Sequence, residues 1–427
     1  RPASGGPILT HSAGLGAAVT GRACENAVMR VDANFYGSVP MPDAGYGGPA
    51  PTDRRYDNPD FLACYDHLTH WSKTMDRLGY DTMWLTEHHF QYEGYEVTPN
   101  LILFGLHLAK ETERLRLGQM FNVVPQWHPL RLAEDAAMMQ ILTCNRIQFG
   151  VGRGTVPREA QSLGGVVASG DNEMSAELDR INREICEESI ESIKAAWTNE
   201  RFSFTGKHFV LPPPGIPDRG STVQDLTLIP KPIAPIEVWQ AVTSPPTLDY
   251  CARARHSAVI PGRGIADTKK WWNDFGDKAA AAGWHIGRSD ARCLAIPMHV
   301  GRTSAEARAG ARNAHDEWIK FLSPYGRFRA YRMPDGSPVP FDFKPTLEDS
   351  IEQDQMVIGS PEECADVIGR YREEVGVEHF VMFFDMPGLT KEQMDEQLEM
   401  TATEVLPKLG VTLSGPTAGP TEWVLPA

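Results

Sequence analysis

The sequence predicts a single-domain α/β fold, a (β/α)8 TIM barrel with insertions. Short apolar segments alternate with longer amphipathic segments along the chain, which is the pattern of β/α units around a parallel sheet. No Pro-, Gly- or Ser-rich linker divides this alternation, and 427 residues are enough for one large barrel. We therefore expect one barrel domain over residues 29–410.

Eight strands and the helices between them account for this domain. The predicted strands are 30–36, 81–87, 115–124, 146–151, 236–241, 257–260, 292–300 and 378–384. The predicted helices are 59–78, 100–112, 129–142, 173–198, 245–254, 266–282, 303–322, 361–375 and 390–408. Pro129 suits the first turn of its helix, and Ile181, Ile185 and Ile193 recur at helical spacing in the long helix 173–198.

Two tails and three long segments fall outside this alternation. Residues 1–28 are rich in Gly, Ala and Ser and lack a continuous apolar stretch, so we expect a disordered extension rather than a signal peptide. Residues 411–427 contain three Pro and two Gly, which predicts a flexible tail. The segments 37–57, 200–235 and 324–355 read as insertions, the second as a hairpin plus an extended loop, and the third could cover the site.

Composition limits the classes of function. The formal net charge of −15 argues against a nucleic-acid or anionic-membrane partner, because both require a basic surface. The chain has no apolar run of about 18 residues, the length that a transmembrane helix needs. Its seven Cys are dispersed without C-x-x-C spacing, which favours reduced cysteines in a cytoplasmic protein and gives no zinc-type cluster.

The most informative motif follows the second predicted strand. There the apolar segment ends in Thr86, Glu87, His88, His89 and Phe90. Active sites of β/α barrels form at the carboxyl ends of the strands. We therefore predict that Glu87, His88 and His89 are catalytic, against the alternative of an ordinary solvated surface loop.

Two further motifs lie at strand ends. The fourth strand leads into Gly150–Gly154, where glycines allow close approach to a ligand and Arg153 offers a planar fork for a phosphate. The fifth leads into 242–247, where Ser244 and Thr247 open a helix and would help to bind an anion. The simpler alternatives are a tight turn and a helix cap. The run Trp127–Asp135 reads mainly as structural.

These segments, in this order, resemble the bacterial luciferase-like flavin-dependent monooxygenase family from about Met29 to Leu409. The family motif Phe-Asp-Thr-x-Trp-x-x-Glu-His-His-Phe corresponds to Tyr80–Phe90, and His-Pro-x-Arg-x-x-Glu-Asp corresponds to His128–Asp135. Gly-Arg-Phe-x-Phe-Gly-x-x-Arg-Gly corresponds to Asn145–Gly154, and Gly-Thr-Pro-Glu-Glu-Cys to Gly359–Cys364. The motifs are modest singly and specific together.

The resemblance implies a site for reduced FMN at the carboxyl ends of the strands. In it His88 would be the catalytic base, with His89 and Glu87 beside it. The implied cofactor-binding residues are Arg153, Ser244 and Thr247 at the phosphate, Met120 and Phe121 as a cis non-prolyl pair against the flavin ring, and Gly152. Luciferases carry a reactive Cys where this chain has Gly152, which removes one reason to expect light emission.

The resemblance also implies partners and a reaction. A flavin reductase would supply reduced FMN, and O2 would be the co-substrate. One oxygen atom would pass through a peroxyflavin into a small apolar organic substrate, and the protein would be a homodimer.

Two alternatives within the fold remain: a deazaflavin-dependent oxidoreductase and a non-catalytic FMN-binding protein. The Glu-His-His run favours the monooxygenase. A metal-dependent hydrolase is disfavoured, because His88 and His89 are adjacent in sequence and their side chains point to opposite faces.

Overall fold

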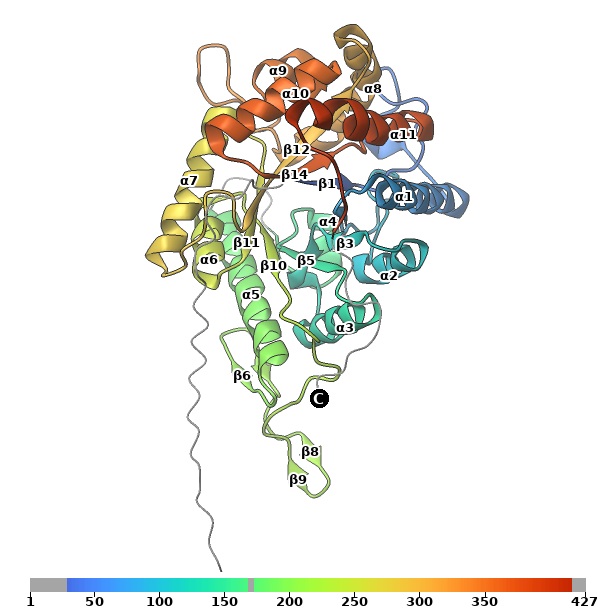
Figure 1. Cartoon of the computed structure of the whole chain (residues 1–427). Helices are drawn as coiled ribbons and strands as arrows, with labels where there is room; N and C mark the ends of the chain where they lie inside the picture. Colours follow the sequence, from blue (N-terminus) through green and yellow to red (C-terminus); the bar gives the residue numbers. More distant parts are fainter. Residues whose placement is uncertain (1–28, 168–172, 417–427) are drawn as a thin grey trace, which may run out of the picture.

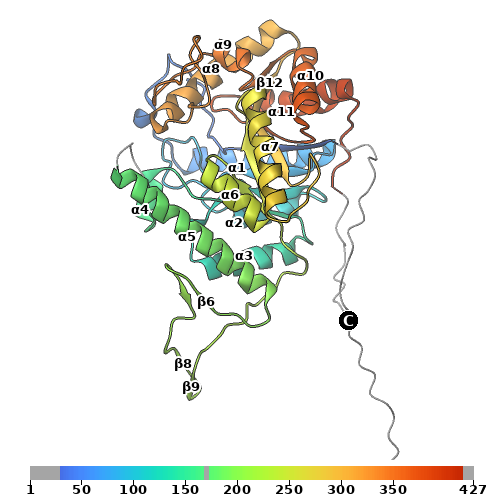
Figure 2. The same cartoon turned by 90° about the vertical axis from the view of Figure 1, so that its left-hand side faces the viewer.

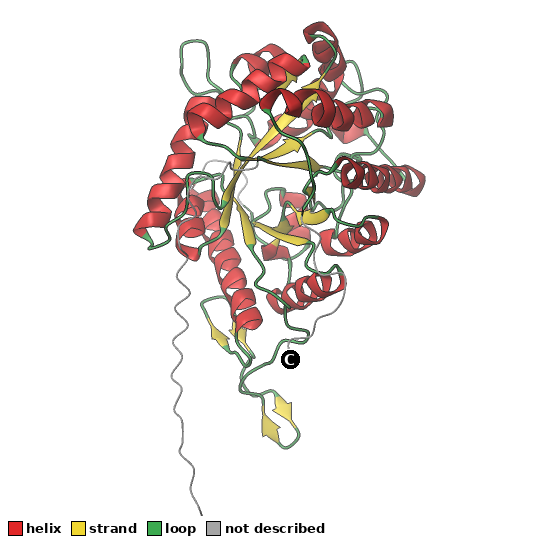
Figure 3. Ribbon diagram, viewed as in Figure 1, coloured by secondary structure: helices red, strands yellow, loops and turns green. Residues whose placement is uncertain are grey.

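The computed structural model describes residues 29–167 and 173–416. Within these ranges eight parallel strands form a closed barrel, and the helices lie around its outside (Figure 1 and Figure 3). The predicted (β/α)8 TIM barrel is therefore confirmed. The predicted extension over residues 1–28 lies outside the described residues.

The barrel strands share one direction. In order around the barrel they are β1 (Arg30–Phe35), β2 (Thr82–Leu85), β3 (Arg116–Gln119), β5 (Ile147–Gly152), β10 (Val238–Ala241), β11 (Ser257–Pro261), β12 (Arg292–Val300) and β14 (His379–Phe383). The ring closes because β14 pairs with β1 and β10 pairs with β5. Since every neighbouring pair is parallel, the carboxyl ends of all eight strands meet at one mouth.

In the described part of the chain nine α-helices lie close to the predicted ranges, and two, over residues 157–162 and 347–352, were not predicted. The helices are α1 (Asn58–Leu78), α2 (Leu101–Glu111), α3 (Pro129–Leu142), α4 (Pro157–Ser162), α5 (Glu173–Thr198), α6 (Pro245–Ala254), α7 (Ile265–Ala281), α8 (Ser304–Leu322), α9 (Leu347–Glu352), α10 (Pro361–Arg370) and α11 (Lys391–Met400). Ser360 and Thr390 begin α10 and α11 with capping boxes, which satisfy the first backbone N–H groups. Figure 2 shows α5, α6 and α7 along one side of the molecule.

The structure divides the predicted strand 115–124 in two. β3 ends at Gln119, and the chain resumes as β4 (Asn122–Val123), which pairs with the end of β5. The Met120–Phe121 peptide between them is cis, as the resemblance implied. A second short strand, β13 (Val357–Gly359), pairs with the carboxyl-terminal part of β12.

The segment 200–235 forms two hairpins rather than one. β6 (Phe204–Thr205) pairs with β7 (Val210–Leu211), and β8 (Pro217–Asp218) pairs with β9 (Ser221–Thr222). The second hairpin projects away from the barrel (Figure 1).

The end of the chain is described as far as residue 416. In this part Val411 is buried, and the N–H of Gly415 donates to the carbonyl of Gly79 at 2.7 Å. The first residues of the predicted flexible tail 411–427 therefore lie against the barrel.

A buried charge cluster occupies the amino-terminal half of the barrel interior. Asp32 on β1 accepts hydrogen bonds from Trp84 Nε1 on β2 (2.8 Å) and His379 Nε2 on β14 (2.8 Å), and Arg30 pairs with it at 3.0 Å. Burial by itself would raise the pKa of Asp32, but Arg30 and His379 outweigh it and lower that pKa to about 2. This cluster ties three strands together and leaves the opposite mouth for a ligand. Among the described helices none has the length and apolar character needed to span a membrane.

Candidate active site

The residues singled out from the sequence gather at the mouth where the barrel strands end. Glu87, His88 and His89 follow β2, Gly152 ends β5 and Arg153 follows it, and Ser244 precedes α6 just after β10. Because β5 and β10 are hydrogen-bonded neighbours, their two loops start side by side.

The buried carboxylate of Glu87 contacts the ring of His89. The carboxylate of Glu87 is 2% exposed and accepts hydrogen bonds from Trp127 Nε1 at 2.9 Å and from the N–H of Val123 at 3.1 Å. His89 Nε2 lies 3.0 Å from Glu87 Oε1. Since Glu87 is fixed by two other donors, it can set the orientation of the His89 ring.

His88 lies between two carboxylates. Its Nδ1 is 3.1 Å from Glu159 Oε1, and its Nε2 is 3.1 Å from Glu96 Oε2. Burial would lower the pKa of His88, but the charge of Glu96 and the hydrogen bond to Glu159 outweigh it and raise that pKa. A doubly protonated imidazole can donate to Glu159 through Nδ1 and form an ion pair with Glu96 through Nε2.

The two carboxylates differ from each other. Burial would raise the pKa of Glu159, but the hydrogen bond from His88 lowers it, and Gln91 Nε2 adds a second donor at 2.7 Å. Burial raises the pKa of Glu96 despite the neighbouring His88. Glu159 is therefore the anionic partner of His88, and Glu96 is the carboxyl that takes up a proton more readily.

Glu96 and Glu159 were not predicted as site residues. Glu159 lies on α4, a six-residue helix whose first residue is Pro157, directly after the Gly-Arg-Gly turn. That Pro is the one local signal for the helix. Glu96 lies in the loop between β2 and α2, where the sequence shows no regular pattern.

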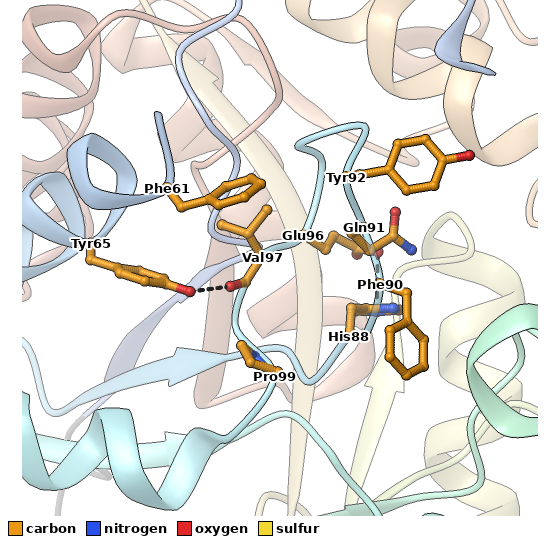
Figure 4. A pocket seen from close by; sticks show the side chains of 9 residues that line it. All are labelled: Phe61, Tyr65, His88, Phe90, Gln91, Tyr92, Glu96, Val97 and Pro99. Atoms are coloured by element: carbon orange, nitrogen blue, oxygen red, sulfur yellow. Dashed lines mark hydrogen bonds and ion pairs between the residues drawn. The ribbon is translucent and has the colours of Figure 1, made fainter. Parts of the chain in front are cut away.

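His88 and Glu96 also border a cavity of about 410 Å³. Phe61 and Tyr65 of α1 face it from one side, and the loop after β2 faces it from the other (Figure 4). The remaining lining residues are Phe90, Gln91, Tyr92, Val97 and Pro99. The lining is mainly aromatic and aliphatic, so the cavity suits an apolar molecule with a polar group near His88.

The predicted anion-binding residues lie in the two adjacent loops. Ser244 Oγ and Thr247 Oγ1 are 2.9 Å apart at the start of α6, and Arg153 pairs with Asp179 Oδ1 at 2.7 Å. Arg263, which was not predicted as a site residue, reaches the same region from the loop after β11, with Nη2 3.4 Å from the carbonyl of Thr243. Its Nε is buried without a partner.

A glycine and an unpartnered amide line the barrel near the carboxyl ends of its strands. A Cβ at Gly152 would lie 3.0 Å from Phe121 Cβ, so glycine permits the close approach of β5 to the cis pair. Asn34 lies two residues after Asp32 on β1 and so faces the barrel interior. Its side-chain nitrogen and oxygen are both buried without a partner. Among the described residues no group of three or more His, Cys, Asp or Glu side chains is arranged to hold a metal ion.

One loop of the insertion 324–355 reaches this mouth. Arg327 Nη2 donates to Thr155 Oγ1 at 2.6 Å, just beyond the Gly-Arg-Gly turn. Phe328 and Tyr331 anchor the insertion by packing against Ile319 of α8. The insertion is thus joined to the loop that carries Arg153.

The chain is similar to known proteins over most of its length. The model of the family described as luciferase-like monooxygenase matches residues 48–379. The 4-hydroxyprotoasukamycin monooxygenase of Streptomyces nodosus subsp. asukaensis is 25% identical over 82% of this chain and 88% of its own length. The limonene 1,2-monooxygenase of Rhodococcus erythropolis is 26% identical over 71% of this chain and 70% of its own.

A solved structure has the same fold. It is the oxygenating constituent of 3,6-diketocamphane monooxygenase from Pseudomonas putida, a type II Baeyer–Villiger monooxygenase in complex with FMN. It aligns with a TM-score of 0.69 at 19% identity and covers 90% of this chain and 99% of its own. With a family match across most of the barrel, this chain belongs to the luciferase-like monooxygenase family.

Proposed function

We propose that this protein is the oxygenase of a two-component, FMN-dependent monooxygenase. It would take reduced FMN from a separate flavin reductase and place one atom of O2 into a small apolar organic substrate. The observation that carries the proposal is His88, which is held between two carboxylates beside an apolar cavity at the catalytic mouth of the barrel.

The residues at this mouth fit FMN. Ser244, Thr247, Arg153 and Arg263 offer hydroxyl and guanidinium donors for a phosphate, and Arg263 Nε is a buried donor without a partner. Gly152 lets β5 approach the cis Met120–Phe121 pair closely, a flavin ring would lie against this pair, and the unpartnered Asn34 amide offers a donor and an acceptor. A structural neighbour was solved with FMN, which supports the same cofactor.

FMN, when bound in reduced form, supplies the activation of O2. The chain's own residues would exclude water and move protons. The aromatic side chains around the cavity keep solvent from the reacting atoms. His88, with a raised pKa, would release or accept a proton at Nε2, and Glu87 would hold the neighbouring His89 in place.

The substrate and partner follow from the cavity and the relatives. A cavity of about 410 Å³ with an aromatic lining suits a compact apolar molecule. One relative is a limonene 1,2-monooxygenase, which acts on such a molecule. The neighbour described as an oxygenating constituent supports a separate reductase. From the family resemblance we also propose a homodimer, and from the dispersed cysteines a cytoplasmic location.

Replacing His88 tests the function. In His88→Ala we expect reduced FMN still to bind while product yield falls by about 100-fold, because a positioned proton donor contributes about that much. His128→Ala serves as the matched control, since His128 lies outside the cavity lining. Full product yield in His88→Ala would contradict the assignment. Turnover without oxygen consumption would indicate the deazaflavin alternative.

A further inference from the structure

Both ring nitrogens of His88 are engaged by carboxylates, so the imidazole does not present a bare nitrogen to the cavity. Nδ1 faces Glu159 and Nε2 faces Glu96, each at 3.1 Å. A proton that passes between His88 and a molecule in the cavity must therefore use one of these two carboxylates, or the contact must first break.

The two carboxylates are not equivalent routes. Glu159 is 2% exposed, accepts a second hydrogen bond from Gln91, and does not border the cavity. Glu96 borders the cavity and forms an ion pair with His88. Figure 4 shows Glu96 and His88 on the same side of this space.

We propose that Glu96 is the acid–base group that faces the substrate, and that it relays protons between His88 and a molecule in the cavity. This inference rests on the proposed function. The proton on Nε2 of the His88 imidazolium passes to Oε2 of Glu96, which leaves a neutral imidazole and a neutral carboxylic acid. The acid then gives the proton to a basic oxygen in the cavity and returns to its carboxylate form. The net result is transfer of one proton from His88 to that oxygen.

The electrostatics of the pair support this relay. Burial raises the pKa of Glu96 above its ordinary value, which makes this carboxylate a better proton acceptor for the His88 imidazolium, and the charge of Glu96 in turn helps to raise the pKa of His88. Glu159 stays anionic and stabilises the imidazolium from the far side. The other charged or titratable groups that act on this pair are Arg327, Asp385, Tyr36 and Tyr325.

The substitution Glu96→Gln keeps the shape of the side chain and removes its acid–base function. Glu93→Gln is the matched control, because Glu93 lies on the same loop but pairs with Arg158 (2.6 and 2.9 Å) rather than with His88. The first readout needs no flavin. It is the NMR titration of the His88 ring in the free protein, assigned by comparison with His88→Gln. We expect the pKa of His88 to fall in Glu96→Gln and to stay unchanged in Glu93→Gln.

The second readout is oxidation of bound reduced FMN by dissolved O2 with release of hydrogen peroxide, a reaction that takes up one proton. We expect its rate to fall at least about tenfold in Glu96→Gln, with reduced FMN affinity unchanged. Formate should restore the rate in Glu96→Ala, whereas chloride should not, because only formate can carry the proton.

The two readouts together distinguish failure of the relay from failure of the proposed function. An unchanged pKa of His88 together with an unchanged oxidation rate in Glu96→Gln would overturn the relay. If Glu96→Gln lowers the pKa of His88 but oxidises bound reduced FMN at the wild-type rate, the relay is also overturned, because Glu96 would then affect the charge of His88 without passing protons. If the wild-type protein fails to bind reduced FMN, the proposed function fails, and the His88 titration still decides whether Glu96 is coupled to His88.

Discussion

His379, on the last barrel strand, donates through Nε2 to Asp32 on the first strand at 2.8 Å, inside the barrel. The bond closes β14 onto β1 at the point where the two ends of the barrel sequence meet. Arg30 forms an ion pair with the same carboxylate, and the Trp84 indole donates a hydrogen bond to it. An ion pair at this depth leaves a buried charge if either partner is removed.

We predict that Asp32→Asn lowers the free energy of unfolding by about 3 kcal/mol near pH 7, because Arg30 loses its counter-charge and His379 loses an anionic acceptor. The pKa of Asp32 is lowered to about 2 in the folded protein, below its ordinary value. Its contribution is therefore present above about pH 4 and is lost as the pH falls towards 2. Chemical denaturation at several pH values measures this. The exposed Asp66→Asn is the control, and an equal loss in both variants would contradict the prediction.

The contact between Glu159 and His88 stabilises the fold, and this stabilisation decreases as the pH rises. The folded-state pKa of His88 is raised, so its stabilisation is fully present below its ordinary value of about 6.5 and is lost as the pH rises through the raised value. We predict that Glu159→Gln is most destabilising at low pH within this window. Unfolding curves from pH 5.5 to 8.5 test it, and a deficit that grew with pH would contradict the assigned pairing.

Trp127 fixes Glu87, and through it His89. Removing the indole N–H in Trp127→Phe leaves a buried carboxylate one donor short, which costs about 1–2 kcal/mol of stability. We also expect the His89 ring to lose its single orientation, visible as broadened or doubled His89 signals by NMR. Trp284→Phe is the control, since the Trp284 ring packs edge-to-face against Phe275 of α7. A sharp, unshifted His89 signal in Trp127→Phe would argue against this support.

The hydroxyl pair at the start of α6 is predicted to bind the FMN phosphate. Ser244→Ala should weaken FMN binding by about tenfold, because hydrogen bonds to a charged group are worth about 1.5 kcal/mol or more. Riboflavin lacks the phosphate, so its affinity should not change. Calorimetry with both flavins measures the difference, with Ser221→Ala in the distant hairpin as control. Equal losses for FMN and riboflavin would place the phosphate elsewhere.

The barrel could be predicted because its signals are local. Apolar strands, Pro at first helical turns and the capping residues of α10 and α11 all lie in short stretches of sequence. Strand ends were predicted less accurately. The predicted strand 115–124 is broken after Gln119 by the cis Met120–Phe121 peptide, and the two parts, β3 and β4, both pair with β5.

The sequence predicted some residues of the candidate site and not others. Glu87, His88 and His89 stand out because they interrupt an apolar segment at a strand end. Glu96 and Glu159 lie 8 and 71 residues from His88 in sequence, and each looks like an ordinary surface carboxylate until the fold brings it to the imidazole. One local signal, Pro157 at the start of α4, marks the helix that delivers Glu159.

Anaerobic titration of the protein with reduced FMN, followed by mixing with air, tests the central claim most directly. The account predicts saturable binding and an oxidation of the bound flavin that is slower than that of free reduced FMN, because the apolar cavity excludes water. Failure to bind reduced FMN, or bound flavin that oxidises as fast as the free cofactor, would contradict the assignment as an FMN-dependent monooxygenase.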